Sequence, residues 1–271
     1  MAEYTPMMQQ YLKTKEEYKD CILFYRLGDF YEMFFDDAIV VSKELELTLT
    51  GKSCGTEERA PMCGVPYHAV EGYLNKLVAN GHKVAICEQV EDPKLAKGLV
   101  KREVIRIVTP GTNTDMQALD ESKNNYIMCI VYLADKYGIS LADISTGDYF
   151  VTEVDSERKL IDEINKFAPS EIICNESFYM SGVDLSDMKH RLGIAVYSLE
   201  SWYFSDETAE NTLKEHFKVQ SLEGLGLSDY ACGTIAAGAL LRYLYETQKN
   251  DLGNLSSIHP YSTGKYMIID S

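Results

Sequence analysis

The residues with the clearest chemical potential form a short segment near the N-terminus, Phe30-Tyr31-Glu32. In an extended backbone alternate side chains share a face, so Phe30 and Glu32 would lie on the same side of a strand. An aromatic ring beside a carboxylate can stack on a flat ligand and hydrogen-bond the ligand's edge. The alternative is a core strand that leads into a helix, with Glu32 at its solvated edge. The pattern alone leaves both interpretations open.

One basic tract lies between Pro93 and Gly111, in a chain that is otherwise acidic. Its basic residues outnumber its single acidic residue, Glu103, to give a charge of +4. The basic residues are Lys94, Lys97, Lys101, Arg102 and Arg106. Contacts to a phosphate backbone require Lys or Arg and little else. An ordinary solvated face has the same composition, so this alternative also stays open.

Lys52 lies in a polar segment, Gly51-Lys52-Ser53-Cys54-Gly55, that has the composition of a loop tip. The Gly-Lys-Ser triplet is similar to the end of a nucleotide-binding phosphate loop. That motif requires a glycine five positions before Gly51, where Glu46 stands, and no other copy occurs in the chain. The sequence therefore contains no ATPase of that type, and Lys52 is a candidate phosphate contact through its charge alone.

Four aspartates lie on or beside three consecutive strand candidates further along the chain: Asp135, Asp143, Asp148 and Asp155. In ribonuclease-H-like nucleases, carboxylates on such strands hold two metal ions. The first of the three strands, residues 126–133, contains no carboxylate. Acids solvated at turns are the simpler explanation, so we expect no catalytic residue and no metal site here. We also expect His68 to cap the helix that follows it.

The composition excludes one class of nucleic-acid-binding protein. The chain has 271 residues, 42 acidic and 26 basic, and a formal charge of −16. A protein that holds nucleic acid by bulk attraction needs an excess of Lys and Arg to displace counterions from phosphates. The apolar content of 45% suffices for buried cores, and the length suggests two domains.

Cysteine usage and hydropathy indicate the compartment. The seven cysteines are widely spaced and form no Cys-x-x-Cys pair, a pattern typical of reduced, buried thiols. No signal peptide is recognisable. The uncharged run over residues 230–241 is shorter than the roughly 20 residues that span a bilayer. We therefore expect a cytoplasmic protein without a membrane segment.

The first block of the chain reads as mixed α and β. Thr5-Pro6 is a favourable helix start, with Thr as N-cap. Strands are expected over residues 21–27, 83–90 and 103–108, and Gly28-Asp29 ends the first of them. Apolar residues recur at helical spacing over 34–45 and, more regularly, over 70–78, where Asn80-Gly81 predicts the C-terminal cap.

The second block begins with three consecutive strand candidates, at 126–133, 138–144 and 149–154. A helix, two strands and two helices follow, over residues 160–167, 171–174, 194–198, 207–217 and 229–247. The last helix is rich in Ala and Gly, which predicts close packing against a sheet. Three meandering strands followed by alternating α and β elements are similar to the ribonuclease-H-like architecture. The expected fold class is therefore mixed α/β, with a polar linker between the blocks.

The order of several motifs resembles the MutS family of DNA mismatch-repair proteins. The matching segments run in family order: Thr5–Leu12, Phe24–Phe34, Gly64–Val70, Val84–Gln89 and Arg106–Thr112. Ala236–Ala239 is similar to the end of the family's connector domain, and Met267–Asp270 to the start of its core (lever) domain. The resemblance implies an N-terminal fragment with a mismatch-recognition domain (1–115), a linker (116–125), a ribonuclease-H-like connector domain (126–250), and a second linker with the start of the lever domain (251–271).

The resemblance also implies site residues. In the family, the Phe of a Phe-x-Glu motif enters the minor groove and stacks on a mismatched base, and the Glu hydrogen-bonds that base. By position these roles fall on Phe30 and Glu32. The expected contacts to the DNA backbone are Lys52, Lys97, Lys101, Arg102 and Arg106.

The resemblance also implies partners and cofactors. Full-length family proteins are homodimeric ATPases that use ATP and Mg, and their connector meets a downstream MutL-type protein. This fragment is expected to have no enzymatic activity, no cofactor of its own and a location near the nucleoid. The alternatives are a metal-dependent ribonuclease-H-like nuclease and an acidic protein-interaction module. Residues 1–120 carry a net charge of −5 and residues 121–271 one of −11, so the block expected to meet DNA is the less acidic.

Overall fold

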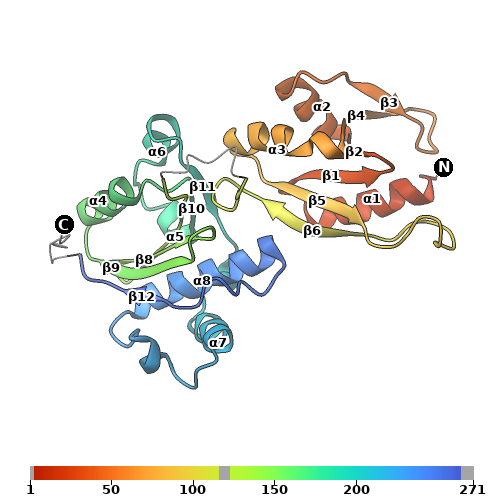
Figure 1. Cartoon of the computed structure of the whole chain (residues 1–271). Helices are drawn as coiled ribbons and strands as arrows, with labels where there is room; N and C mark the ends of the chain where they lie inside the picture. The colour runs from red at the N-terminus through yellow and green to blue at the C-terminus, as the bar shows by residue number, and fades with distance from the viewer. Residues whose placement is uncertain (1–2, 116–122, 264–271) are drawn as a thin grey trace. The chain divides into compact units, whose positions relative to one another are not determined.

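The computed structural model describes residues 3–115 and 123–263, and the chain folds into two compact units that divide between residues 118 and 119 (Figure 1). Thr247–Lys249 group with the first unit. Each unit combines one mixed sheet with helices, which confirms the mixed α/β class. The first part of the expected first linker, residues 116–122, and the motif Met267–Asp270 lie outside the described residues.

The first unit contains a six-stranded sheet in the order β3-β4-β2-β1-β5-β6. The strands are β1 (Ile22–Leu27), β2 (Phe30–Phe34), β3 (Thr50–Lys52), β4 (Ala60–Pro66), β5 (Val84–Gln89) and β6 (Arg102–Val108). The helices are α1 (Pro6–Glu17), α2 (Phe35–Glu44), the 3₁₀ turn η1 (Tyr67–Ala69) and α3 (Val70–Ala79). β1 pairs parallel with β5, and the other pairs are antiparallel.

Both faces of this sheet are covered, α2 and α3 lying on one face and α1 on the other (Figure 1). Alternation along the strands assigns the aromatic residues to the two cores. Phe24 and Tyr31 pack with the side chains of α2 and α3, and Tyr25 and Phe34 pack with Tyr11 of α1. Two buried faces explain why so many aromatic residues are used in so short a segment.

The predicted helix ends in this unit are confirmed. The Thr5 hydroxyl accepts a hydrogen bond from the Met8 amide at 3.3 Å, and Asn80 is the C-cap of α3, followed by Gly81 at φ +88°. The prediction for His68 is wrong. No side chain caps α3, because Ala69 occupies the N-cap position and His68 lies within η1. The His68 ring contacts the ring of Tyr67 edge-on instead.

The second unit has a six-stranded sheet in the order β11-β10-β7-β8-β9-β12. The strands are β7 (Ile127–Leu133), β8 (Lys136–Asp143), β9 (Asp148–Val154), β10 (Glu171–Cys174), β11 (Ala195–Ser198) and β12 (His259–Pro260). The helices are α4 (Glu157–Phe167), α5 (Glu176–Tyr179), α6 (Leu185–Arg191), α7 (Asp206–Phe217) and α8 (Ala231–Gln248), with 3₁₀ turns η2 (Ser201–Phe204) and η3 (Leu222–Leu225).

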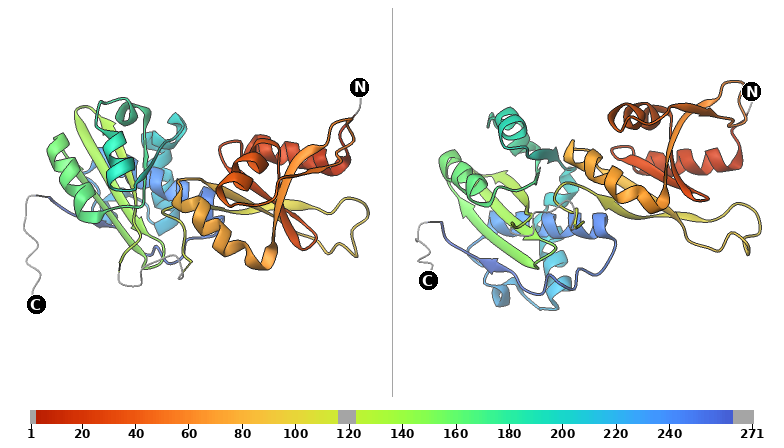
Figure 2. Two further views of the ribbon diagram at one scale, coloured as in Figure 1. Left: turned by 90° about the horizontal axis from the view of Figure 1, so that it is seen from above. Right: turned by 45° about the horizontal axis from the view of Figure 1, so that its top comes forward.

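The predicted order of three meandering strands and then alternating elements is confirmed in this unit. β7, β8 and β9 are antiparallel, while β10 and β11 add in parallel. Helix α4 covers one face and α8 the other (Figure 2). The close packing against a sheet that is expected of α8 is present, since a Cβ at Gly233 would lie 2.9 Å from the Thr152 carbonyl oxygen of β9. The short strand β12, in the segment expected to be a linker, pairs with β9.

Candidate functional site

Phe30 begins β2 directly after a two-residue turn, Gly28-Asp29, that joins it to β1. Leu27 and Phe30 are paired across the turn, and Gly28 takes φ +58°. Tight hairpin turns of this length require such a left-handed conformation, which glycine adopts without strain. The turn therefore fixes Phe30 at one end of the sheet.

Phe30 is the solvent-exposed aromatic residue of β2, whose other aromatic residues are buried. Its side chain is 47% exposed, whereas Tyr31 is 7% exposed and Phe34 is 1% exposed. The core-strand interpretation thus holds for its neighbours and fails for Phe30. Beside the ring, a Cβ built on Gly64 of β4 would lie 3.8 Å from Phe30 Cδ1 and 3.5 Å from Glu32 Cγ. Gly64 therefore leaves free space next to both side chains.

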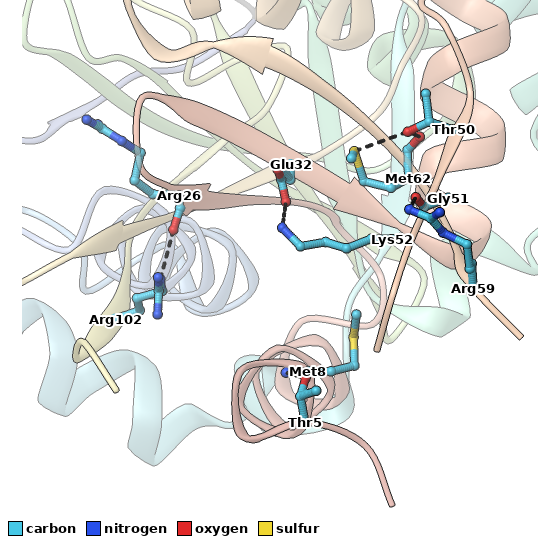
Figure 3. A network of polar contacts seen from close by, with 10 residues as sticks. All are labelled: Thr5, Met8, Arg26, Glu32, Thr50, Gly51, Lys52, Arg59, Met62 and Arg102. Carbon is cyan, nitrogen blue, oxygen red and sulfur yellow. Dashed lines mark hydrogen bonds and ion pairs between the residues drawn. The ribbon is translucent and has the colours of Figure 1, made fainter. Parts of the chain in front are cut away.

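Glu32 lies on the same face as Phe30, as the alternation predicts, but not at a solvated edge. Its carboxylate forms an ion pair with Lys52 Nζ at 2.8 Å (Figure 3). The side chains are 15% and 32% exposed, so the pair is partly shielded from water. Lys52 reaches Glu32 from β3, across the intervening strand β4, and its ammonium also lies 5.9 Å from the centre of the Phe34 ring.

Arg102 of the basic tract makes its contacts inside the first unit. Its Nε donates to the Arg26 carbonyl at 2.8 Å (Figure 3). Its Nη1 donates to Gln10 Oε1 at 3.0 Å. The guanidinium lies 5.0 Å from the centre of the Tyr25 ring. These contacts join β6 to β1 and α1, so Arg102 functions as a structural link.

The other residues of the tract are distributed over two places. Lys97 and Lys101 lie in the loop from β5 to β6. Because β5 is parallel to β1, that loop leaves the sheet at the same end as the Phe30 turn. Lys97 is exposed, while Lys101 pairs with Glu103 at 3.1 Å. Arg106 lies within β6 and pairs with Glu71 of α3 at 2.8 Å.

Sequence reasoning missed a cluster on the opposite face of the hairpin, formed by Arg26, Tyr67 and Glu88. Arg26 Nη1 pairs with Glu88 Oε1 at 2.6 Å, and the Arg26 guanidinium lies 3.9 Å from the centre of the Tyr67 ring. One signal was present in the sequence. Pairing of the strands across the two-residue turn Gly28-Asp29 sets Arg26 opposite Tyr31, and therefore on the face that does not carry Phe30.

The four aspartates of the second unit have structural partners. Asp143 is buried and accepts hydrogen bonds from the backbone amides of Asn125 and Ser145 and from the Ser145 hydroxyl at 2.6 Å. Asp148 accepts from the Tyr126 hydroxyl at 3.2 Å. Burial is the main cause that raises the pKa of Tyr126 to about 12, and Asp148 adds to it.

The two remaining aspartates also have structural partners. Asp135 accepts a hydrogen bond from the Tyr132 hydroxyl, and Asp155 forms an ion pair with Lys159, four residues further on. Within residues 3–115 and 123–263, no three His, Cys, Asp or Glu side chains are grouped so that they could hold a metal ion. These observations give the nuclease alternative no support.

All seven cysteines are buried and free, and burial is the main cause that raises the pKa of Cys87 to about 12. No described helix combines the length and apolarity that crossing a membrane requires.

The comparisons with known proteins follow the same division into two units. The family model described as MutS domain I matches residues 5–117, and that for MutS domain II matches residues 125–256. The two units thus have the architecture of the first two domains of a MutS-type protein. The chain belongs to the MutS family.

Several curated relatives are similar over the whole chain. The protein named DNA mismatch repair protein MutS from Lachnoclostridium phytofermentans is 66% identical over 271 residues. The proteins of the same name from Acetivibrio thermocellus and Clostridioides difficile are 52% and 48% identical. The alignments cover 100% of this chain and 29%, 31% and 28% of those relatives, so the chain spans about three tenths of their length.

Proposed function

We propose that this chain recognises mismatched or unpaired bases in duplex DNA, with Phe30 as an aromatic wedge and Glu32 as the group that hydrogen-bonds the displaced base. The observation that carries this proposal is the exposure of Phe30, at 47%, at the start of a strand whose other aromatic residues are buried. The names of the relatives, DNA mismatch repair protein MutS, supply the substrate class.

The physics of a wedge favours a mismatch over a matched pair. Insertion of an apolar side chain unstacks a base step, which costs about a few kcal/mol, and the cost is lowest where pairing is already defective. Stacking on an aromatic ring returns about 1–3 kcal/mol and does not depend on which base is present. Each 1.4 kcal/mol of difference changes the binding ratio about tenfold.

A carboxylate near the phosphates of DNA is repelled by their negative charge, and Lys52 reduces this repulsion for Glu32. In the free protein its ammonium lies 2.8 Å from Glu32, which offsets the charge that would repel the DNA backbone. Lys52, Lys97, Lys101 and Arg106 remain our proposed backbone contacts. We assign Arg102 a supporting role, because its hydrogen bonds are made inside the protein. It would affect DNA binding only by holding β1 and β6 in place.

The rest of the repair reaction belongs to the longer protein. We propose that the second unit relays between mismatch recognition and an ATPase outside this chain and offers a surface to a MutL-type partner, and that the longer protein is a homodimer. ATP and Mg would bind outside this chain, since Gly51-Lys52 belongs to an edge strand and is followed by a loop, not by the helix that a phosphate loop requires.

The test compares the binding of mismatched and matched duplexes by the 271-residue chain and by its Phe30→Ala variant. We expect weak binding, micromolar or weaker, with a shallow salt dependence that reflects few phosphate contacts. Phe30→Ala should remove most of the preference for the mismatch. Trp202→Ala is the control, because Trp202 is also 47% exposed but lies in the second unit. Equal binding of mismatched duplex by Phe30→Ala and the parent would show that the wedge assignment is wrong.

A further inference from the structure

Arg26 occupies the face of the β1–β2 hairpin that lies opposite Phe30. It is paired in register with Tyr31, so Arg26 and Tyr31 share one face while Phe30 and Glu32 share the other. The Arg26 side chain is only 16% exposed. A guanidinium shielded to this extent must have its donors satisfied by the protein itself.

Three separate parts of the chain meet at this guanidinium. Arg26 Nε donates to the carbonyl of Gly28, within the hairpin turn. Nη1 donates to Glu88 of β5 at 2.6 Å, and Cζ lies 3.9 Å from the centre of the Tyr67 ring in η1. Arg26 thus connects the turn that precedes Phe30 to a neighbouring strand and to the end of β4.

The cluster is closed by further contacts. The Tyr31 hydroxyl donates to Glu88 Oε2 at 3.2 Å, and the Tyr67 amide donates to the carbonyl of Asp29 at 2.9 Å. Both residues of the turn therefore have their carbonyl oxygens held, Gly28 by Arg26 and Asp29 by the backbone of Tyr67. A turn held at both residues can move little relative to the sheet.

We propose that Arg26 is a positioning residue for mismatch recognition, because it holds the Gly28-Asp29 turn against Glu88 and Tyr67 so that Phe30 is presented in one orientation. This inference rests on the proposed function of Phe30. A wedge must push against stacked bases, and a support that yields loses binding free energy to the ordering of the loop. Arg26 acts from behind the wedge and not as a ligand of DNA, since its hydrogen bonds are directed into the protein.

The chemistry of the cluster requires arginine specifically. A guanidinium donates within its plane to Gly28 and Glu88 while its face stacks on the Tyr67 ring. A lysine ammonium keeps the charge but is a single point without a face, so it cannot make these contacts together. Arg26→Lys therefore separates the two roles that the residue could have. A phosphate contact would tolerate lysine, whereas a positioning contact would not.

The experiment uses the 271-residue chain with Arg26→Lys, and Arg59→Lys as the matched control. Arg59 precedes β4 at the end of the sheet away from Phe30 and donates to the Gly51 carbonyl. Amide hydrogen exchange measures the order of the turn in the absence of DNA. Titrations with mismatched and matched duplex at low ionic strength measure the two binding affinities. A second pair, Tyr67→Phe and Tyr67→Leu, keeps or removes the aromatic face.

For Arg26→Lys we expect amide exchange at residues 28–31 to accelerate about tenfold, with the strands of the second unit unchanged. The ratio of mismatched to matched affinity should fall about fivefold, which corresponds to about 1 kcal/mol. The salt dependence and the affinity for matched duplex should stay as in the parent. Tyr67→Leu should reproduce part of the effect, Tyr67→Phe should behave like the parent, and Arg59→Lys should change neither measurement.

Two results would overturn the inference. Unchanged exchange at residues 28–31 in Arg26→Lys would show that the turn does not depend on the guanidinium. A parental affinity ratio in Arg26→Lys, with a loss of affinity for both duplexes in Arg26→Gln, would identify a phosphate contact instead. Phe30→Ala, measured in parallel, separates the two proposals. If that variant binds mismatched duplex like the parent, the wedge assignment fails, while the exchange data still decide whether Arg26 orders the turn.

Discussion

The Glu32 carboxylate and the Lys52 ammonium lie 2.8 Å apart although β4 separates their strands in the sheet. The pair crosses the strand that carries Gly64, the residue whose missing side chain leaves space beside Phe30. The charged group and the aromatic ring of the candidate site are therefore held on one face of the sheet by three strands.

This relationship gives a first prediction. Lys52→Met removes the counter-ion of Glu32 and should lower the free energy of unfolding by about 0.5–1 kcal/mol, the range for a partly exposed pair. Glu32→Gln should cost a similar amount, and the double variant less than the sum of the two, because both changes remove one interaction. Urea denaturation of the four proteins measures the coupling. Strict additivity would mean that the pair contributes nothing to stability.

A second prediction concerns Gly64. A Cβ at this position would lie 3.3 Å from the Tyr31 carbonyl oxygen and close to Phe30 and Glu32. Gly64→Val should fill the space beside the ring and lower the affinity for mismatched duplex several-fold, about 1 kcal/mol or more. Gly72→Ala is a suitable control, because a Cβ there meets no atom within 4 Å. Fluorescence anisotropy with labelled duplexes would check both variants.

A third prediction separates support from contact within the basic tract. Arg102→Ala removes the side-chain donor to the Arg26 carbonyl and one of the two donors to Gln10 Oε1, the other being the Tyr25 hydroxyl, and it should lower the free energy of unfolding by about 1–3 kcal/mol. Lys97→Ala changes an exposed residue and should leave stability within about 0.5 kcal/mol of the parent. If Lys97 contacts a phosphate, the same change should reduce the salt dependence of DNA binding. Thermal unfolding and a salt titration together distinguish the two residues.

A fourth prediction concerns alkaline pH. Burial is the main cause that raises the pKa of Tyr31 to about 12, with Glu88 as the next cause, and burial likewise raises the pKa of Tyr25 to about 12. A raised pKa in the folded state means that the unfolded chain loses the proton first. Stability is then complete below about pH 10 and falls as the pH rises toward 12. Tyr31→Phe should weaken this fall, and urea denaturation between pH 8 and 11 would measure it. An equal slope in parent and variant would contradict the assignment.

A fifth prediction addresses the second unit. Asp143→Ala should destabilise the β8–β9 turn by about 1–3 kcal/mol, because it removes the acceptor of the Asn125 and Ser145 amides. Asp155→Ala, at an exposed ion pair, should be nearly neutral. Neither the parent nor these variants should cleave DNA or RNA when Mg²⁺ or Mn²⁺ is added. Metal-dependent cleavage that Asp143→Ala abolishes would restore the nuclease alternative.

Local rules predicted much of this structure. The period of two placed Phe30 and Glu32 on one face, and Thr5, Asn80 and Gly81 marked helix ends correctly. The partner of Glu32 was beyond such rules, because Lys52 lies twenty positions away and is brought near only by strand order. Composition could not separate Arg102, which is turned inward, from Lys97, which is exposed.

The features that the sequence did not predict also have physical causes. Arg26 and Glu88 are 62 positions apart, and their contact depends on the parallel pairing of β1 with β5. His68 was misjudged because a helix that begins at Val70 has Ala69 as its N-cap, so His68 lies one residue too early, within η1. Strand β12 contains only two residues, too few for any periodicity to register.

The pairing of β12 with β9 has a consequence for synthesis and for shortened versions of the chain. The Tyr261 hydroxyl donates to Glu163 at 2.7 Å, and the Tyr261 carbonyl accepts from Thr152 Oγ1 at 2.6 Å. A ribosome must therefore complete a further stretch beyond α8 before the second unit closes its sheet. A truncation at residue 250 would leave β9 as an open edge and Glu163 without its tyrosine, and such an edge promotes aggregation.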